Sequence, residues 1–135
     1  MIGILADANI QGYVDFLVAV MQAEPWSLFW DDLKITYVRF ADIGLPHNAP
    51  DPLIWETCQQ RDLVLITDNR SEEDSDSLET TIREKSTIKS LPVFTIGDVQ
   101  QLRHSRDYMN RVIEKFLESM ERIDSLRGTG RLYLP

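Results

Sequence analysis

Four short segments of the chain consist mainly of apolar residues, with threonine and tyrosine among them. They are residues 3–6, 35–38, 63–66 and 93–96. Three of the four are nearly continuous apolar runs, which is typical of strands that are covered on both faces, as in a parallel sheet. We therefore predict these segments as strands of one sheet.

Helical patterns alternate with these strands. Residues 11–23 are apolar on almost every side, residues 52–61 follow Asp51 and begin with Pro52, and residues 77–89 follow Asp76. Aspartate followed by proline predicts an N-cap with proline at the first helical position. Glu79, three positions after Asp76, gives that helix a start that resembles a capping box.

The longest predicted helix runs from about residue 106 to 127. Ser105 is placed to cap its start, and Gly128 to end it. Its apolar residues keep the i, i+3, i+4, i+7 spacing of an amphipathic helix and are Met109, Val112, Ile113, Phe116, Met120 and Ile123.

Strands that alternate with helices predict βαβ units and a three-layer α/β/α fold with a mainly parallel sheet. The 135 residues are the size of one domain, so we predict a single domain over 1–135, with the C-terminal helix and tail (about 104–135) as an extension. Right-handed crossovers place the carboxyl ends of all strands at one edge, where open α/β sheets bind ligands.

Three aspartates are candidates for a site at this edge. Asp7 directly follows the first strand, and Asp68 directly follows the third. Asp51 starts the helix before the third strand and reaches the edge only if the loop of residues 41–50 crosses over the sheet. Converging carboxylates repel one another unless a cation or protons intervene, and Mg²⁺ or Mn²⁺ prefers such oxygen ligands.

Each acid also has a structural explanation. Asp51 can serve as an N-cap alone, and Asp68 can open a turn. Asp7 is the hardest to explain in this way, because an acid at the end of a buried strand needs a partner. The acidic run 72–76 is typical of a solvated loop, although one of its acids could be a fourth ligand.

Composition and charge limit the classes of function. One cysteine and two histidines exclude a zinc cluster, and the chain shows neither a signal-peptide pattern nor an apolar run long enough to span a membrane. A cytoplasmic protein is expected. The net charge of −8 argues against a generic nucleic-acid-binding surface. Residues 103–135 are different, because they hold seven basic and five acidic residues, which form either a solvated helix face or an edge that contacts phosphates.

Two parts of the sequence resemble a known family. Residues 4–10 (ILADANI) are similar to the opening "L-A-D-E-N" of compact PIN-like proteins related to the Mut7-C domain. Residues 38–70 continue the match with Ile43-Gly44-Leu45, then the DPLI of residues 51–54, then the RDLVLITD of residues 61–68. About half of the chain is covered, with the pieces in the family's order and spacing.

The resemblance implies a PIN-like fold and a Mg²⁺- or Mn²⁺-dependent endoribonuclease, toxin-like, with Asp7, Asp51 and Asp68 as metal-site acids. It also implies single-stranded RNA as substrate, with Asn9, Asn69 and Arg70 as candidate contacts, and a homodimer or an antitoxin as possible partner. The chain departs from the family pattern in two places. Ala8 replaces a second acid, and residues 69–71 (NRS) replace the usual residues after the third acid.

Other classes of function fit the sequence less well. A non-catalytic PIN-like binding module is the strongest alternative, because the acid at position 8 is missing. A haloacid-dehalogenase-type phosphotransferase would need a second acid where Asn9 stands. A receiver domain, with Asp68 as phosphoacceptor and Thr95 as switch, would need a lysine at the end of a fifth strand, and residues 97–127 look helical throughout.

Overall fold

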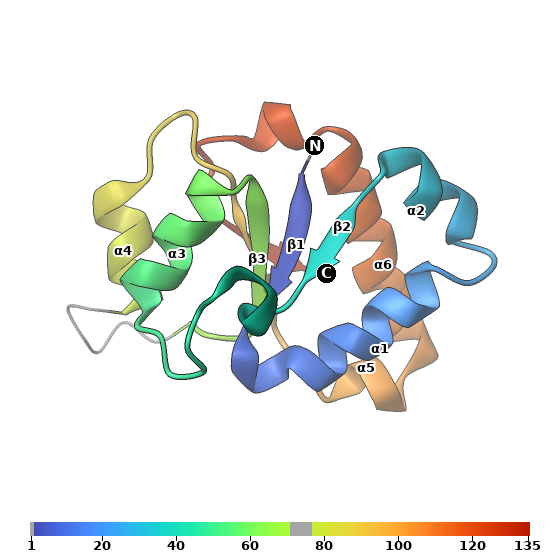
Figure 1. Ribbon diagram of the computed structural model, residues 1–135. Coiled ribbons are helices and arrows are strands. Elements are labelled where there is room, and N and C mark those ends of the chain that lie inside the picture. The colour runs from blue at the N-terminus through green and yellow to red at the C-terminus, as the bar shows by residue number, and fades with distance from the viewer. Residues whose placement is uncertain (1, 71–76) are drawn as a thin grey trace.

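The apolar runs form the centre of a parallel sheet. The computed structural model, which describes residues 2–70 and 77–135, contains strands β1 (Gly3–Ala6), β2 (Thr36–Val38), β3 (Leu63–Thr67) and β4 (Val93–Ile96). A fifth strand, β5 (Arg131–Leu134), joins them in the order β2-β1-β3-β4-β5, and every pairing is parallel (Figure 1). The α/β class and the parallel sheet are confirmed, whereas the tail contains a strand that the sequence pattern did not predict.

Helices cover both faces of this sheet, as a three-layer α/β/α fold requires (Figure 1). One face is covered by α1 (Gln11–Met21), α2 (Ser27–Leu33), α5 (Gln101–His104) and α6 (Arg106–Glu121). The other face is covered by α3 (Asp51–Gln60) and α4 (Leu78–Lys85). Short 3₁₀ turns lie at η1 (Ala8–Ile10), η2 (Phe40–Ile43) and η3 (Ile123–Leu126). No helix in the described part of the chain is long and apolar enough to cross a membrane.

The helix ends differ from the predicted ones in several places. The N-cap of α3 is Pro50, so Asp51 is the first helical residue and its side chain does not cap its own helix. The N-cap of α4 is Ser77, whose hydroxyl accepts the Thr80 amide at 3.1 Å, and the predicted cap Asp76 lies outside the described residues. The Ser105 cap of α6 is confirmed.

The predicted end of the longest helix at Gly128 is wrong. Helix α6 ends at Glu121, and the chain continues in the 3₁₀ turn η3. Ile123 is buried in this turn and therefore extends the apolar spacing beyond the true end of the helix. Helix α2, which was not predicted, has only seven residues.

The sheet separates two apolar clusters because successive side chains of a strand point to opposite faces. Ile4 and Ala6 belong to the cluster under α1 and α6, whereas Leu5 belongs to the cluster under α3 and α4. The same alternation on β3 places Val64 and Ile66 on the first side and Leu63 and Leu65 on the second. This alternation decides which side chains lie on the same face of the sheet and can therefore meet at its carboxyl edge.

Gly3 allows β1 to lie close to its neighbours, and Gly3→Ala is expected to destabilise the protein. A Cβ at this position would lie 2.8 Å from the Thr36 carbonyl oxygen, which belongs to the backbone and cannot rotate away. Such overpacking costs about 1–3 kcal/mol of unfolding free energy, measurable by urea denaturation. Gly97→Ala is the matched control, because nothing lies within 4 Å of its added Cβ. Equal stability of the two variants would contradict this account.

Candidate active site

The candidate site lies where the strand order reverses. The chain passes from β1 to β2 on one side and later enters β3 on the other side of β1, so the switch point of the sheet lies between the carboxyl ends of β1 and β3. Open α/β sheets of this order bind ligands at this point. Asp7 follows β1 and Asp68 follows β3, so both acids lie at this switch point.

Asp51 reaches the same edge from α3. Helices that link parallel strands run back along the sheet, so α3 begins at the carboxyl edge. The Asp51 Oδ2 atom accepts a hydrogen bond from the Asn69 side-chain amide at 3.2 Å and from the Leu78 backbone amide at 3.0 Å. Asn69 lies just beyond β3, and Leu78 opens α4. The chain therefore brings Asp51 to the edge, as the site prediction required.

Asp7 is partly buried and has a partner, as expected for an acid at the end of a buried strand. Its Oδ2 accepts the Thr67 hydroxyl at 2.7 Å. Thr67 points to the same face of β3 as Leu63 and Leu65. The hydrogen bond between Thr67 and Asp7 therefore lies on the α3 and α4 side of the sheet. Burial raises the pKa of Asp7, the Thr67 hydrogen bond opposes this, and the charges of Asp51 and Asp68 raise the pKa further. The negative charges of Asp51 and Asp68 therefore lie near enough to act on Asp7.

The other two acids are held by asparagines. The Asn9 side-chain amide donates to Asp68 Oδ1 at 3.4 Å, a long hydrogen bond from η1. Asn69 connects several parts of the site. Its side-chain amide holds Asp51, and its backbone amide donates to the Thr67 hydroxyl at 3.0 Å. Asn9 and Asn69, predicted as substrate contacts, thus lie at the site and orient its carboxylates.

A buried arginine supports this network from β5. Arg131 Nη1 donates to the Asn69 carbonyl at 2.8 Å and to the Thr95 hydroxyl at 2.7 Å, and its Nε contacts Glu79 of α4 at 3.0 Å. The Arg131 side chain is only 7% exposed and that of Glu79 22%. Within the described part of the chain, Arg131 Nη2 is buried and has no hydrogen-bond partner.

The carboxylates are coupled without forming a closed ligand shell. Among residues 2–70 and 77–135, no group of three or more histidine, cysteine, aspartate or glutamate side chains lies close enough together to hold a metal ion. The donor set is nevertheless made of oxygen atoms. The acidic run 72–76, predicted as the source of a fourth ligand, lies outside the described residues.

The predicted basic contacts fall into two groups. Arg70 is exposed next to Asn69 and forms no hydrogen bond or ion pair with any described residue. Four of the seven basic residues of the C-terminal third are instead held in ion pairs by acids: Arg111, Arg122, Arg127 and Arg131. Most of the basic residues that a phosphate-contacting edge would use are thus paired with acids within the chain.

Sequence reasoning assigned no role at this site to Thr67 and Glu79, and considered Thr95 only for a receiver domain. Thr67 and Thr95 are fully buried and are paired in register on β3 and β4. The sequence feature that points to these two threonines is a polar residue at or near the end of an otherwise apolar run. Glu79 gave a different signal and was interpreted as part of a capping box.

Cys58 lies close enough to Asp7 to sense its charge. Burial, followed by the negative charge of Asp7, raises the pKa of the Cys58 thiol to about 12. The thiol therefore stays protonated at neutral pH and is a poor nucleophile and metal ligand. The structure thus gives Cys58 a packing role on α3, where its side chain belongs to the apolar cluster.

Asp7→Asn is expected to raise the stability of the metal-free protein at neutral pH. The raised pKa means that the folded state holds the Asp7 proton more tightly than the unfolded chain does, so stability falls as pH rises through the folded pKa. The asparagine can still accept the Thr67 hydroxyl but carries no charge. Its advantage over wild type should disappear below about pH 4, where the unfolded carboxyl is protonated as well.

The measurement is the urea unfolding free energy of both proteins between about pH 3 and pH 8, which brackets the titration of ordinary carboxyl groups. Gly97→Ala changes no charge, so its difference from wild type should be independent of pH. If Asp7→Asn is less stable than wild type by the same amount at every pH, burial does not penalise the charged form of Asp7.

Comparisons with protein-family models, with curated proteins and with solved structures gave no match for this chain. The functional argument therefore rests on the site itself.

Proposed function

We propose that this chain is a PIN-like, metal-dependent endoribonuclease of toxin-like type that hydrolyses phosphodiester bonds in single-stranded RNA. The observation that carries the proposal is that Asp7, Asp51 and Asp68 approach one another at the carboxyl edge between β1 and β3, where the charges of Asp51 and Asp68 act on Asp7. Among the described residues, these carboxylates are held only by neutral hydroxyl and amide donors. None of these donors carries a positive charge, so an added cation would offset the repulsion among the three carboxylates.

The residues present fit a hard divalent cation. The site offers carboxylate, hydroxyl and amide oxygens, and burial, together with the negative charges of Asp51 and Asp68, raises the pKa of Asp7, so a nearby cation would favour its charged form. Asp7, Asp51 and Asp68 would hold Mg²⁺ or Mn²⁺ partly through water, which is how Mg²⁺ usually binds in proteins. Such an ion lowers the pKa of a bound water and stabilises charge on scissile phosphate oxygens.

The chain's own residues orient the acids and the substrate. Asn9 and Asn69 fix the carboxylates of Asp68 and Asp51, and Thr67 fixes that of Asp7. The exposed Arg70 would contact RNA phosphates beside the three carboxylates. Arg131 is buried and paired with Glu79, so we assign it a supporting role and not a phosphate contact. With few phosphate contacts, binding should weaken with salt at a slope of about −0.7 per contact.

A non-catalytic binding module is the second candidate. It is favoured by the finding that, in the described part of the chain, no group of three or more metal-ligating side chains is close enough to hold an ion. The net charge of −8 and the internal pairing of C-terminal arginines also favour it. In this case the partner would be a second copy or an antitoxin-like protein, and the acids would form a polar network alone.

The test is cleavage of labelled single-stranded RNA by the purified chain with Mg²⁺ or Mn²⁺. Cleavage is expected with either ion and is expected to stop when EDTA removes it. Cleavage that continues in EDTA would indicate a contaminating nuclease. No cleavage of several unrelated RNAs with either ion would contradict the proposed activity and leave the binding module as the better reading.

A further inference from the structure

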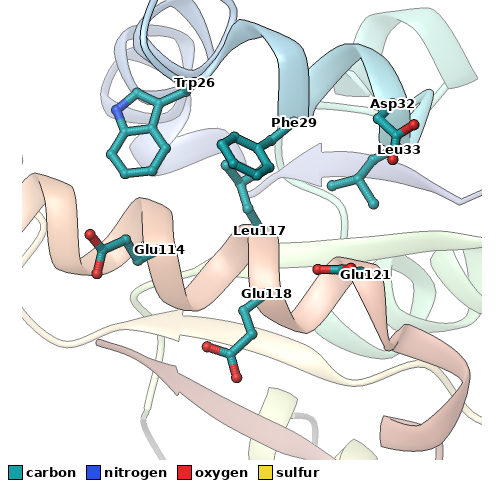
Figure 2. Close-up of a pocket in the computed structure, with 8 residues that line it drawn as sticks. All are labelled: Trp26, Phe29, Asp32, Leu33, Glu114, Leu117, Glu118 and Glu121. Atoms are coloured by element: carbon teal, nitrogen blue, oxygen red, sulfur yellow. The ribbon is translucent and has the colours of Figure 1, made fainter.

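A groove lies between α2 and α6, on the face of the sheet opposite to α3 and α4. It encloses a cavity of about 340 Å³, within the range of ligand pockets. Trp26, Phe29 and Leu33 line it from the α2 side, and Leu117 lines it from α6 (Figure 2). The Phe29 side chain is 60% exposed, so the apolar lining is open to solvent. A large exposed aromatic residue at such a groove is typical of an interaction site.

The remaining lining residues are all acids. Asp32 lies on the α2 side, and Glu114, Glu118 and Glu121 follow one another along α6 (Figure 2). Among the residues that the structure describes, no basic residue lines the groove. Glu118 has a distant partner in Arg122, at 3.9 Å, whereas the other three acids form no ion pair with the described residues. The apolar groove therefore has an acidic rim that the chain itself leaves largely unneutralised.

We propose that this groove binds an amphipathic helix of a partner protein, with apolar side chains facing the groove and lysine or arginine on its flanks. Charge complementarity selects this occupant. The α6 acids at positions 114, 118 and 121 have the i, i+4, i+7 spacing of one helix face and span about 10 Å, or roughly two turns of a partner helix. An apolar groove between two helices is a common way to hold such a helix.

A second copy of this chain fits the groove less well. Two chains that each carry a net charge of −8 repel one another, and an acidic rim would face another acidic surface. The groove also lies away from the proposed active site. Helix α6 starts near the carboxyl edge and runs back along the sheet, so its second half, with Glu114 to Glu121, lies toward the opposite edge. The binding test is therefore independent of nuclease activity.

The experiment measures binding of a fluorescein-labelled helical peptide of about 18 residues, built of leucine and lysine, to the full chain by anisotropy. Saturable binding is expected, and it should weaken as salt rises. Glu114→Gln with Glu121→Gln should raise the Kd about fivefold, because each exposed charge pair contributes modestly. Glu84→Gln with Asp98→Asn changes the net charge equally at exposed acids outside the groove and should leave the Kd unchanged.

A third variant tests the apolar part of the groove. Phe29→Ser removes an exposed ring and should raise the Kd about tenfold, with circular dichroism confirming that the fold is kept. Equal weakening by both double variants would mean generic attraction to an acidic protein and would overturn the proposal. Absence of saturable binding would do the same, and so would a dimer in sedimentation that Phe29→Ser dissociates, since the occupant would then be a second copy.

Discussion

Asp68→Asn is expected to lower the rate of RNA cleavage by at least about a hundredfold. Loss of a residue that only supports a metal ligand typically costs 10–100-fold, so loss of a ligand charge should cost more. Asparagine has the shape of aspartate and can still accept the Asn9 amide, so the fold should remain intact. Asp98→Asn is the matched control, because Asp98 is exposed after β4 and takes no part in the acid network, and its rate should stay within about twofold of wild type.

Thermal unfolding with and without Mn²⁺ separates loss of metal from loss of substrate binding. An ion that binds only the folded state raises the melting temperature of wild type, and Asp68→Asn should lose most of that rise. If the variant keeps both the rise and its activity, Asp68 is not part of the site. If it keeps the rise but loses activity, Asp68 contacts substrate or water rather than the ion.

Arg131→Met is expected to cause the largest loss of stability, about 3 kcal/mol of unfolding free energy. The substitution leaves Glu79 without its partner in a largely buried position and removes the donor to Asn69 and Thr95. Breaking a buried ion pair by removing one member typically costs 3–5 kcal/mol, and we take the low end because Arg131 Nη2 is itself unsatisfied in the described structure. For a domain of this size, the melting temperature should fall by about 10 °C.

Two further variants define the origin of this loss. Arg111→Met removes an exposed pair with Asp107 and should cost less than about 0.5 kcal/mol. Adding Glu79→Gln to Arg131→Met removes the unpaired charge, so the double variant should be more stable than Arg131→Met alone. If the double variant is instead less stable than the single one, the loss arises from packing around Arg131 and not from an uncompensated carboxylate.

The sequence determined the elements whose signals are local. Strands β1, β3 and β4 are buried on both faces, so their residues form apolar runs that are visible without any knowledge of neighbours. Helix α6 shows its buried face through the spacing of Met109, Val112 and Phe116. The positions of Asp7 and Asp68 at the carboxyl edge followed from the same runs, since each acid directly follows one.

Only the tertiary structure decided the rest. Strand β5 lies at the edge of the sheet, where Tyr133 is half-exposed, and it begins with Arg131, so it lacks the fully apolar sequence of a strand that is covered on both faces. Asp51 approaches the carboxyl edge, and hydrogen bonds connect Arg131 to Asn69 and Asn69 to Asp51. Both features depend on which strands and helices become neighbours. The acidic groove depends in turn on the packing of α2 against α6. The local sequence pattern indicates which residues are buried, whereas a contact between residues that are distant in the chain is fixed only when the chain has packed.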